Sequence, residues 1–249
     1  GFMSGEILLN LDSEDEGEIF IGCAGGIDSV AEFTYKEVEV PAGYFFFKVE
    51  VKGLKGGHSG VDIHLGRANA NKLMFRFLKE AVRDYGARLS SVDGGSLRNA
   101  IPREAFAVIT IPGDNVEALW ELVSDYQEMY RYEYKGIEHN INFTAEMTDM
   151  PATLIPEEIQ DDLINAIEGC QNGVISMLVD FPGTVESSTN LAIVKSSNEM
   201  IEIQILVRSS SESRKEAVCS SLESIFSLAG AKVEYSDGYG GSRISIRRS

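Results

Sequence analysis

The chain has 249 residues, of which 43% are hydrophobic, and its formal net charge is −17. That hydrophobic content supports a packed core in one large domain or two small ones. The negative charge argues against nucleic acid and anionic membranes as partners, because both need basic patches. The three cysteines are widely spaced and form no CxxC pair, so neither a disulfide framework nor a zinc knuckle is predicted. With no long apolar run and no signal peptide, we expect a cytoplasmic protein.

The first forty residues contain short strands and an acidic turn. An apolar run at 7–11 predicts a strand buried on both faces, and a cluster of carboxylates begins at Asp12. Taken alone, such a cluster is most often a solvated loop. Further strands are predicted over 18–23 and 32–40.

The next segment combines a strand, a glycine-rich turn and a helix. An aromatic and β-branched strand over 44–51 leads into the GGHSG turn at 56–60. Glycine lets other groups approach the backbone closely, so His58 is expected to be exposed and held by the backbone. Apolar residues then recur at helical spacing and predict a long amphipathic helix over 62–85, which ends at Gly86. A lone histidine in such a loop is more often a turn residue than a functional group.

The remaining elements complete two similar sets. Strands are predicted over 88–92, 106–111, 140–147, 173–179, 185–195, 199–208 and 231–235, and helices over 115–132, 157–169 and 209–228. Residues 44–147 read strand, helix, strands, helix, strand, and residues 151–236 read helix, strands, helix, strand. This order predicts an α+β fold of two ferredoxin-like α/β lobes, with antiparallel sheets and helices packed on one face.

Two further side chains have both a functional and a structural interpretation. Arg208 ends a strand next to a helix start, where a guanidinium can bind a carboxylate bidentately; it can equally be an edge charge paired with one of the many acids. Asn99 either caps a turn or reaches toward a ligand. The sequence pattern alone leaves these alternatives open.

Four segments carry a resemblance to a known family. They are GGHSGVDIHLGRANANKLM at 56–74, NLDSEDEGEIFIGCAGG at 10–26, GSLRNAIPREA at 95–105 and LVRSS at 206–210. Together they resemble the aminoacyl-histidine (Xaa-His) dipeptidases of the M20 metallopeptidase family. The resemblance extends from about residue 12 to about residue 238 and breaks after Tyr239.

The resemblance implies a role for each matching residue. His58 would hold the substrate or the tetrahedral intermediate at a dinuclear zinc site, and Asp12 would be a terminal ligand of one zinc. Arg208 would bind the C-terminal carboxylate of the substrate, and Asn99 would reach toward that substrate. Asn190 lies in a stretch that is near the same site in the family.

Most of the zinc ligands of this family have no match in the sequence. The chain has no His-x-Asp, and its Glu157-Glu158 pair opens a helix instead of flanking a metal. The resemblance therefore implies the lid (dimerisation) domain of a zinc dipeptidase. The parent enzyme would carry two zinc ions per active site, whereas this chain alone is expected to bind none and to be inactive. The implied partners are a dipeptide, the missing catalytic domain and a second copy in a homodimer.

The expected domains follow from these assignments. Residues 1–40 would be an edge of the catalytic domain with linker strands, 41–150 the first lid lobe, 151–238 the second lobe, and 239–249 an atypical tail. The alternative is a non-catalytic ferredoxin-like interaction or regulatory module. Convergence of His58, Asn99 and Arg208 on one surface favours the lid, and their scatter favours the alternative.

Overall fold

The computed structural model describes residues 24–236 and 238–240. The strands are β1 Gly25–Thr34, β2 Tyr44–Lys52, β3 Gly57–His58, β4 Arg88–Gly94, β5 Ala100–Ile101, β6 Ala105–Pro112, β7 Asn142–Met147, β8 Gly173–Met177, β9 Val185–Ser197, β10 Met200–Ser209 and β11 Lys232–Tyr235. The α-helices are α1 Ala70–Tyr85, α2 Val116–Glu133, α3 Glu157–Gly169 and α4 Glu212–Leu228, with the short 3-10 turns η1 Ile63–Leu65 and η2 Gly113–Asn115. None of these helices is long and apolar enough to cross a membrane.

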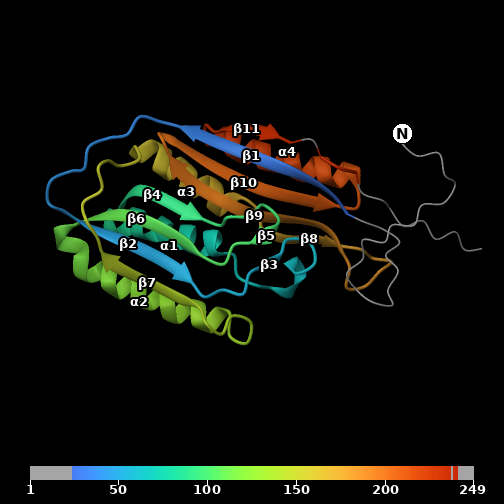
Figure 1. Ribbon diagram of the computed structural model, residues 1–249, viewed down its shortest axis with the longest axis horizontal. Coiled ribbons are helices and arrows are strands. Elements are labelled where there is room, and N and C mark those ends of the chain that lie inside the picture. The colour runs from blue at the N-terminus through green and yellow to red at the C-terminus, as the bar shows by residue number, and fades with distance from the viewer. Residues whose placement is uncertain (1–23, 237, 241–249) are drawn as a thin grey trace, which may run out of the picture.

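Nine of the strands in the described residues form one large antiparallel sheet in the order β11-β1-β10-β9-β4-β6-β2-β7, with β8 beside β9 (Figure 1), and β3 pairs with β5 in a separate two-stranded sheet. The first lobe comprises β2, α1, β4, β6, α2 and β7, which is a β-α-β-β-α-β order. The second lobe repeats that order with β1, α3, β9, β10, α4 and β11, and the first lobe is inserted between its β1 and α3. The lobes join edge to edge where Asp93 of β4 lies opposite Lys195 of β9. The predicted α+β class is confirmed.

All four α-helices lie on one face of the sheet. Helix α1 contacts both α2 and α3, and α3 contacts α4, so the helices form a single layer. On β2 the side chains facing this layer are fully buried: Phe47, Val49 and Val51. The predicted packing of the helices near 62–85 and 115–132 on the same face is therefore confirmed. Figure 1 shows β3 and β5 near the end of the sheet where β1 begins.

Two predicted elements depart furthest from their bounds in the structure. The helix expected from residue 62 starts only at Ala70, because Gly66 adopts the left-handed region at φ 68° and Asn69 caps the helix. The side chain of Asn69 accepts hydrogen bonds from the amides of Asn71 and Lys72. The strand expected over 32–40 is instead β1, which ends at Thr34 and lies between β10 and β11. Predicted strands at 7–11 and 18–23 lie outside the described residues.

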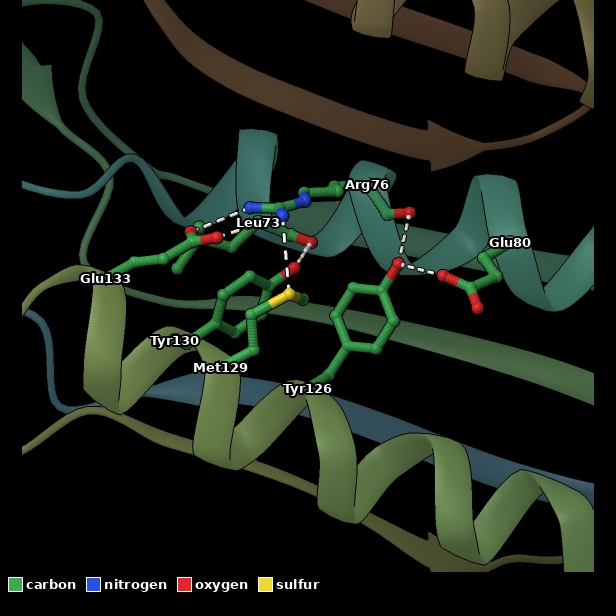
Figure 2. Close-up of polar contacts among 7 residues, drawn as sticks. All are labelled: Leu73, Arg76, Glu80, Tyr126, Met129, Tyr130 and Glu133. Atoms are coloured by element: carbon green, nitrogen blue, oxygen red, sulfur yellow. Dashed lines mark hydrogen bonds and ion pairs between the residues drawn. The ribbon is translucent and has the colours of Figure 1, made fainter.

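Aromatic and polar contacts join α1 to α2 (Figure 2). The Tyr130 hydroxyl donates to the Leu73 carbonyl at 2.6 Å, and the Tyr126 hydroxyl donates to Glu80 at 2.6 Å. Burial raises the pKa of both tyrosines, so their hydroxyls stay protonated donors at neutral pH. Phe77 of α1 packs edge-on against Tyr126 with ring centroids 5.3 Å apart. These contacts hold α1 against α2 in the helix layer of the first lobe.

Leu73→Ala should lower the free energy of unfolding by about 2–5 kcal/mol, because it leaves a cavity in this core. Leu73 lies on α1 and is 3% exposed. Urea denaturation of the chain measures the loss. Leu228→Ala is the matched control, since Leu228 is 89% exposed at the end of α4 and its truncation should change stability by at most about 0.5 kcal/mol. Equal losses for the two variants would place Leu73 outside the core.

Candidate functional site

The GGHSG turn presents His58 at the molecular surface. Residues 57 and 58 form the short strand β3, which pairs with β5 so that His58 lies opposite Ala100. The exposed imidazole accepts hydrogen bonds at Nδ1 from the amides of Gly60 and Val61, at 3.2 and 3.1 Å. With Nδ1 used as an acceptor, the neutral ring carries its proton on Nε2. His58 is therefore oriented as an Nε2–H donor.

Charged side chains hold this turn from within. The Asp62 carboxylate accepts the His58 amide at 2.8 Å and pairs with Arg67 at 3.2 Å. Arg67 also donates to the Gly56 carbonyl at 2.6 Å. A Cβ on Gly57 would lie 2.2 Å from the Arg67 guanidinium and 2.6 Å from the Asp62 carboxylate, and φ there is +141°. The glycine is thus required for Asp62 and Arg67 to close over the backbone.

Arg208 lies directly beside His58. It is the penultimate residue of β10, opposite Gly26 of β1. A Cβ on Gly60 would lie 3.2 Å from His58 Cε1 and 3.3 Å from Arg208 Nε, so the imidazole and the guanidinium flank the same point. Arg208 donates to the Tyr239 hydroxyl at 3.0 Å. Within the described residues its buried Nε has no hydrogen-bond partner.

Asn190 and Asn99 lie near the His58 turn and come from two other segments of the chain. Asn190 of β9 is 1% exposed and donates through Nδ2 to the Ala100 carbonyl at 2.8 Å. In the described part of the chain, its Oδ1 has no hydrogen-bond partner. The Asn99 carbonyl accepts the Ser59 amide at 2.9 Å, which places the exposed Asn99 next to the His58 turn. His58, Asn99 and Arg208 therefore lie close together, and the buried Asn190 contacts the β3–β5 pair that carries His58.

A cavity borders this surface. It has a volume of about 950 Å³ and lies between the 95–104 loop and the sheet face that the helices leave uncovered. Gly57 and Ala100 line it on the site side, and Phe106, Ile193 and Glu202 line it on the sheet side. Arg98 in the same loop pairs with Asp28 of β1. This ion pair holds the loop that carries Asn99 against β1 of the sheet.

The residues described here do not form a metal site. Across residues 24–236 and 238–240, no group of three or more His, Cys, Asp and Glu side chains is arranged to hold a metal ion. Asp12, the predicted zinc ligand, lies outside these ranges. The donor set in the described chain therefore does not fit a zinc centre.

Tyr239 was missed by sequence reasoning as a contact of the site. Its ring covers Gly26, where a Cβ would lie 2.7 Å from the Tyr239 hydroxyl oxygen, and its backbone pairs with Gly26. The sequence shows only a break in pattern at this point. No local signal marks a tyrosine that reaches back to an arginine on another strand.

Comparison with known proteins connects the geometry to a family. Residues 49–138 match the model of the M20 peptidase dimerisation domain. The cytosol non-specific dipeptidase of Escherichia coli (strain K12) is 42% identical over 240 residues, which make up 96% of this chain and 50% of that protein. Residues 49–138 are an M20 peptidase dimerisation domain. The predicted resemblance to M20 dipeptidases is confirmed.

The fold of the chain agrees with that of a solved relative. The crystal structure of aminoacylhistidine dipeptidase from Vibrio alginolyticus matches with a TM-score of 0.93 and 41% identity, covering 98% of this chain and 50% of that one. The chain thus spans about half the length of the relatives it matches. Homology to these dipeptidases includes both lobes, because the alignment covers nearly the whole chain.

Proposed function

We propose that this chain is the lid of a dinuclear zinc dipeptidase that hydrolyses Xaa-His and related dipeptides. The observation that carries the proposal is the position of His58 and Arg208 on either side of Gly60. His58 and Arg208 lie 150 positions apart in the sequence. Similarity to two dipeptidases over nearly the whole chain supports the same reading.

Arg208 would bind the C-terminal carboxylate of the dipeptide. A guanidinium offers five N–H donors in a planar fork that matches a carboxylate. One of its donors is engaged by the Tyr239 hydroxyl, which holds the group in one orientation. The buried Nε edge lies toward Gly60 and the imidazole. A bound carboxylate would therefore place the rest of the dipeptide close to His58.

His58 would stabilise the oxyanion that forms when the peptide carbonyl is attacked. Its Nδ1 is occupied by two backbone amides, so the neutral ring donates from Nε2. A fixed donor aimed at developing negative charge lowers the barrier without reorganising during the reaction. Asn99 and Asn190 would complete the substrate contacts, and the buried Asn190 Oδ1 is an acceptor without a partner among the described residues.

The zinc ions of such an enzyme would be held by residues outside the described part of this chain, with Asp12 proposed as one terminal ligand. When bound, they would supply an activated water. The catalytic domain that holds them, a dipeptide and a second copy of the chain are the proposed partners. We place the protein in the cytoplasm, as the name of the Escherichia coli relative says of that protein.

The proposal is tested by a chimeric dipeptidase. In it, this chain replaces the homologous 240-residue segment of the Escherichia coli enzyme. The chimera should hydrolyse an Xaa-His dipeptide, and the isolated chain with added zinc should not. Calorimetry should find no stoichiometric zinc site of sub-micromolar affinity in the isolated chain. Turnover by the isolated chain, or a chimera that is folded and zinc-loaded yet inactive, would contradict the proposal.

A further inference from the structure

Glu138 is a buried carboxylate that the proposed site does not use. It follows α2 and is 4% exposed. A buried carboxylate is unfavourable unless hydrogen bonds compensate the lost hydration. Its Oε2 accepts the Lys55 amide at 2.8 Å, and its Oε1 accepts the Ala68 amide at 3.0 Å. Both oxygens are therefore used, and both partners are backbone groups.

These two amides stand at the two ends of the loop that carries His58. Lys55 precedes the GGHSG turn, and Ala68 immediately precedes Asn69, the N-cap of α1. One carboxylate thus closes the base of the loop, while Asp62 and Arg67 hold its interior. Hydrogen bonds from an amide to an ionised carboxylate are shorter and stronger than neutral ones.

We propose that Glu138 is a positioning residue for His58. By fixing both ends of the loop, it holds the imidazole beside Arg208 before a substrate arrives. This inference rests on the proposed function, in which a small displacement of His58 misplaces the oxyanion donor. A displacement of about 1 Å at a reacting group can lower a rate on the order of 10²-fold.

Glu138→Gln separates positioning from packing, because the two side chains are almost equal in shape. Gln keeps one acceptor oxygen but presents an NH₂ donor to the second amide. One end of the loop is then released. Glu138→Asp keeps the charge but is one methylene too short to reach both amides. His139→Gln is the matched control, since His139 is the exposed neighbour of Glu138.

NMR of this chain gives the first readout. In the wild type, the amides of Lys55 and Ala68 should exchange slowly, and the ¹⁵N signals of His58 should show Nδ1 unprotonated and Nε2 protonated. In Glu138→Gln at least one of these amides should exchange faster, and His58 should shift toward a mixture of tautomers. His139→Gln should match the wild type. An unchanged His58 spectrum in folded Glu138→Gln would overturn the proposal.

Kinetics of the chimeric dipeptidase give the second readout. Glu138→Gln should lower kcat on the order of 10²-fold with KM near the wild-type value, whereas His139→Gln should change neither. Should Glu138→Gln not fold, the same measurements apply to Glu138→Asp, for which the same loss is expected. Wild-type kcat in a folded variant with fast amide exchange would overturn the positioning role. If His58→Ala also retains full activity, the proposed function fails instead, and the NMR result on the loop stands separately.

Discussion

His58→Ala in the chimeric dipeptidase is expected to lower kcat by about 10²–10³-fold, the usual effect of removing one oxyanion donor. The expectation follows from the two backbone amides that occupy Nδ1 and leave Nε2 as the donor. Bound zinc should stay at the wild-type level, because an oxyanion donor is not a metal ligand. The measurement is kcat together with zinc content in the same preparation.

His64→Ala is the matched control for this experiment. His64 is an exposed histidine in η1, six residues further along the chain, and takes no part in the proposed site. Its replacement should leave both kcat and zinc content unchanged. Loss of zinc in His58→Ala would show instead that the imidazole is a metal ligand. An equal loss of kcat in the two variants would show that His58 is not the oxyanion donor.

Arg208→Ala is expected to lower kcat/KM for dipeptides by about 10²-fold or more. Truncating one partner of a hydrogen-bonded charge pair costs about 2–5 kcal/mol, and each 1.4 kcal/mol corresponds to about tenfold. A dipeptide amide lacks the C-terminal carboxylate, so the wild type should discriminate strongly against it. In Arg208→Ala the preference for the acid over the amide should disappear. Steady-state kinetics with both substrates measure this coupling.

Arg214→Ala provides the comparison, since Arg214 is an exposed arginine on α4 that pairs with Glu186. It should keep the wild-type preference for the free carboxylate. A preference for the acid that survives in Arg208→Ala would mean that another group binds the carboxylate. The substrate ratio is informative even if both variants lose some stability, because it is measured within one protein.

The parts of the fold that the sequence predicts well are those that depend on local patterns. The aromatic run of β2 and the proline-led start of α3 lie within a residue of their predicted bounds. Helical spacing extends N-terminal of α1, so periodicity alone placed its start too early. Gly66 and the cap at Asn69 decide the true start through backbone geometry. The bounds of β1 were wrong because its partners β10 and β11 lie at the other end of the chain.

In the candidate site as well, only the features that have a local sequence pattern are predictable from the sequence. His58 is recognisable because glycines flank it in sequence, and Arg208 because a strand ends there. Their adjacency across Gly60 follows from tertiary structure, which no local sequence pattern predicts. Glu138 and Tyr239 carry no local signal at all, since each acts on a segment far away in the chain.

The insertion of the first lobe between β1 and α3 sets an order of events during synthesis on the ribosome. β1 leaves the exit tunnel early, but its partner β10 follows only after the whole first lobe and α3. At translation rates of about 5–20 residues per second, β1 waits on the order of ten seconds with unpaired backbone. The first lobe can fold in that interval, because its strands and helices are contiguous in the chain. Until β10 is synthesised, β1 exposes the unpaired N–H and C=O groups of a strand, which can pair wrongly with another chain.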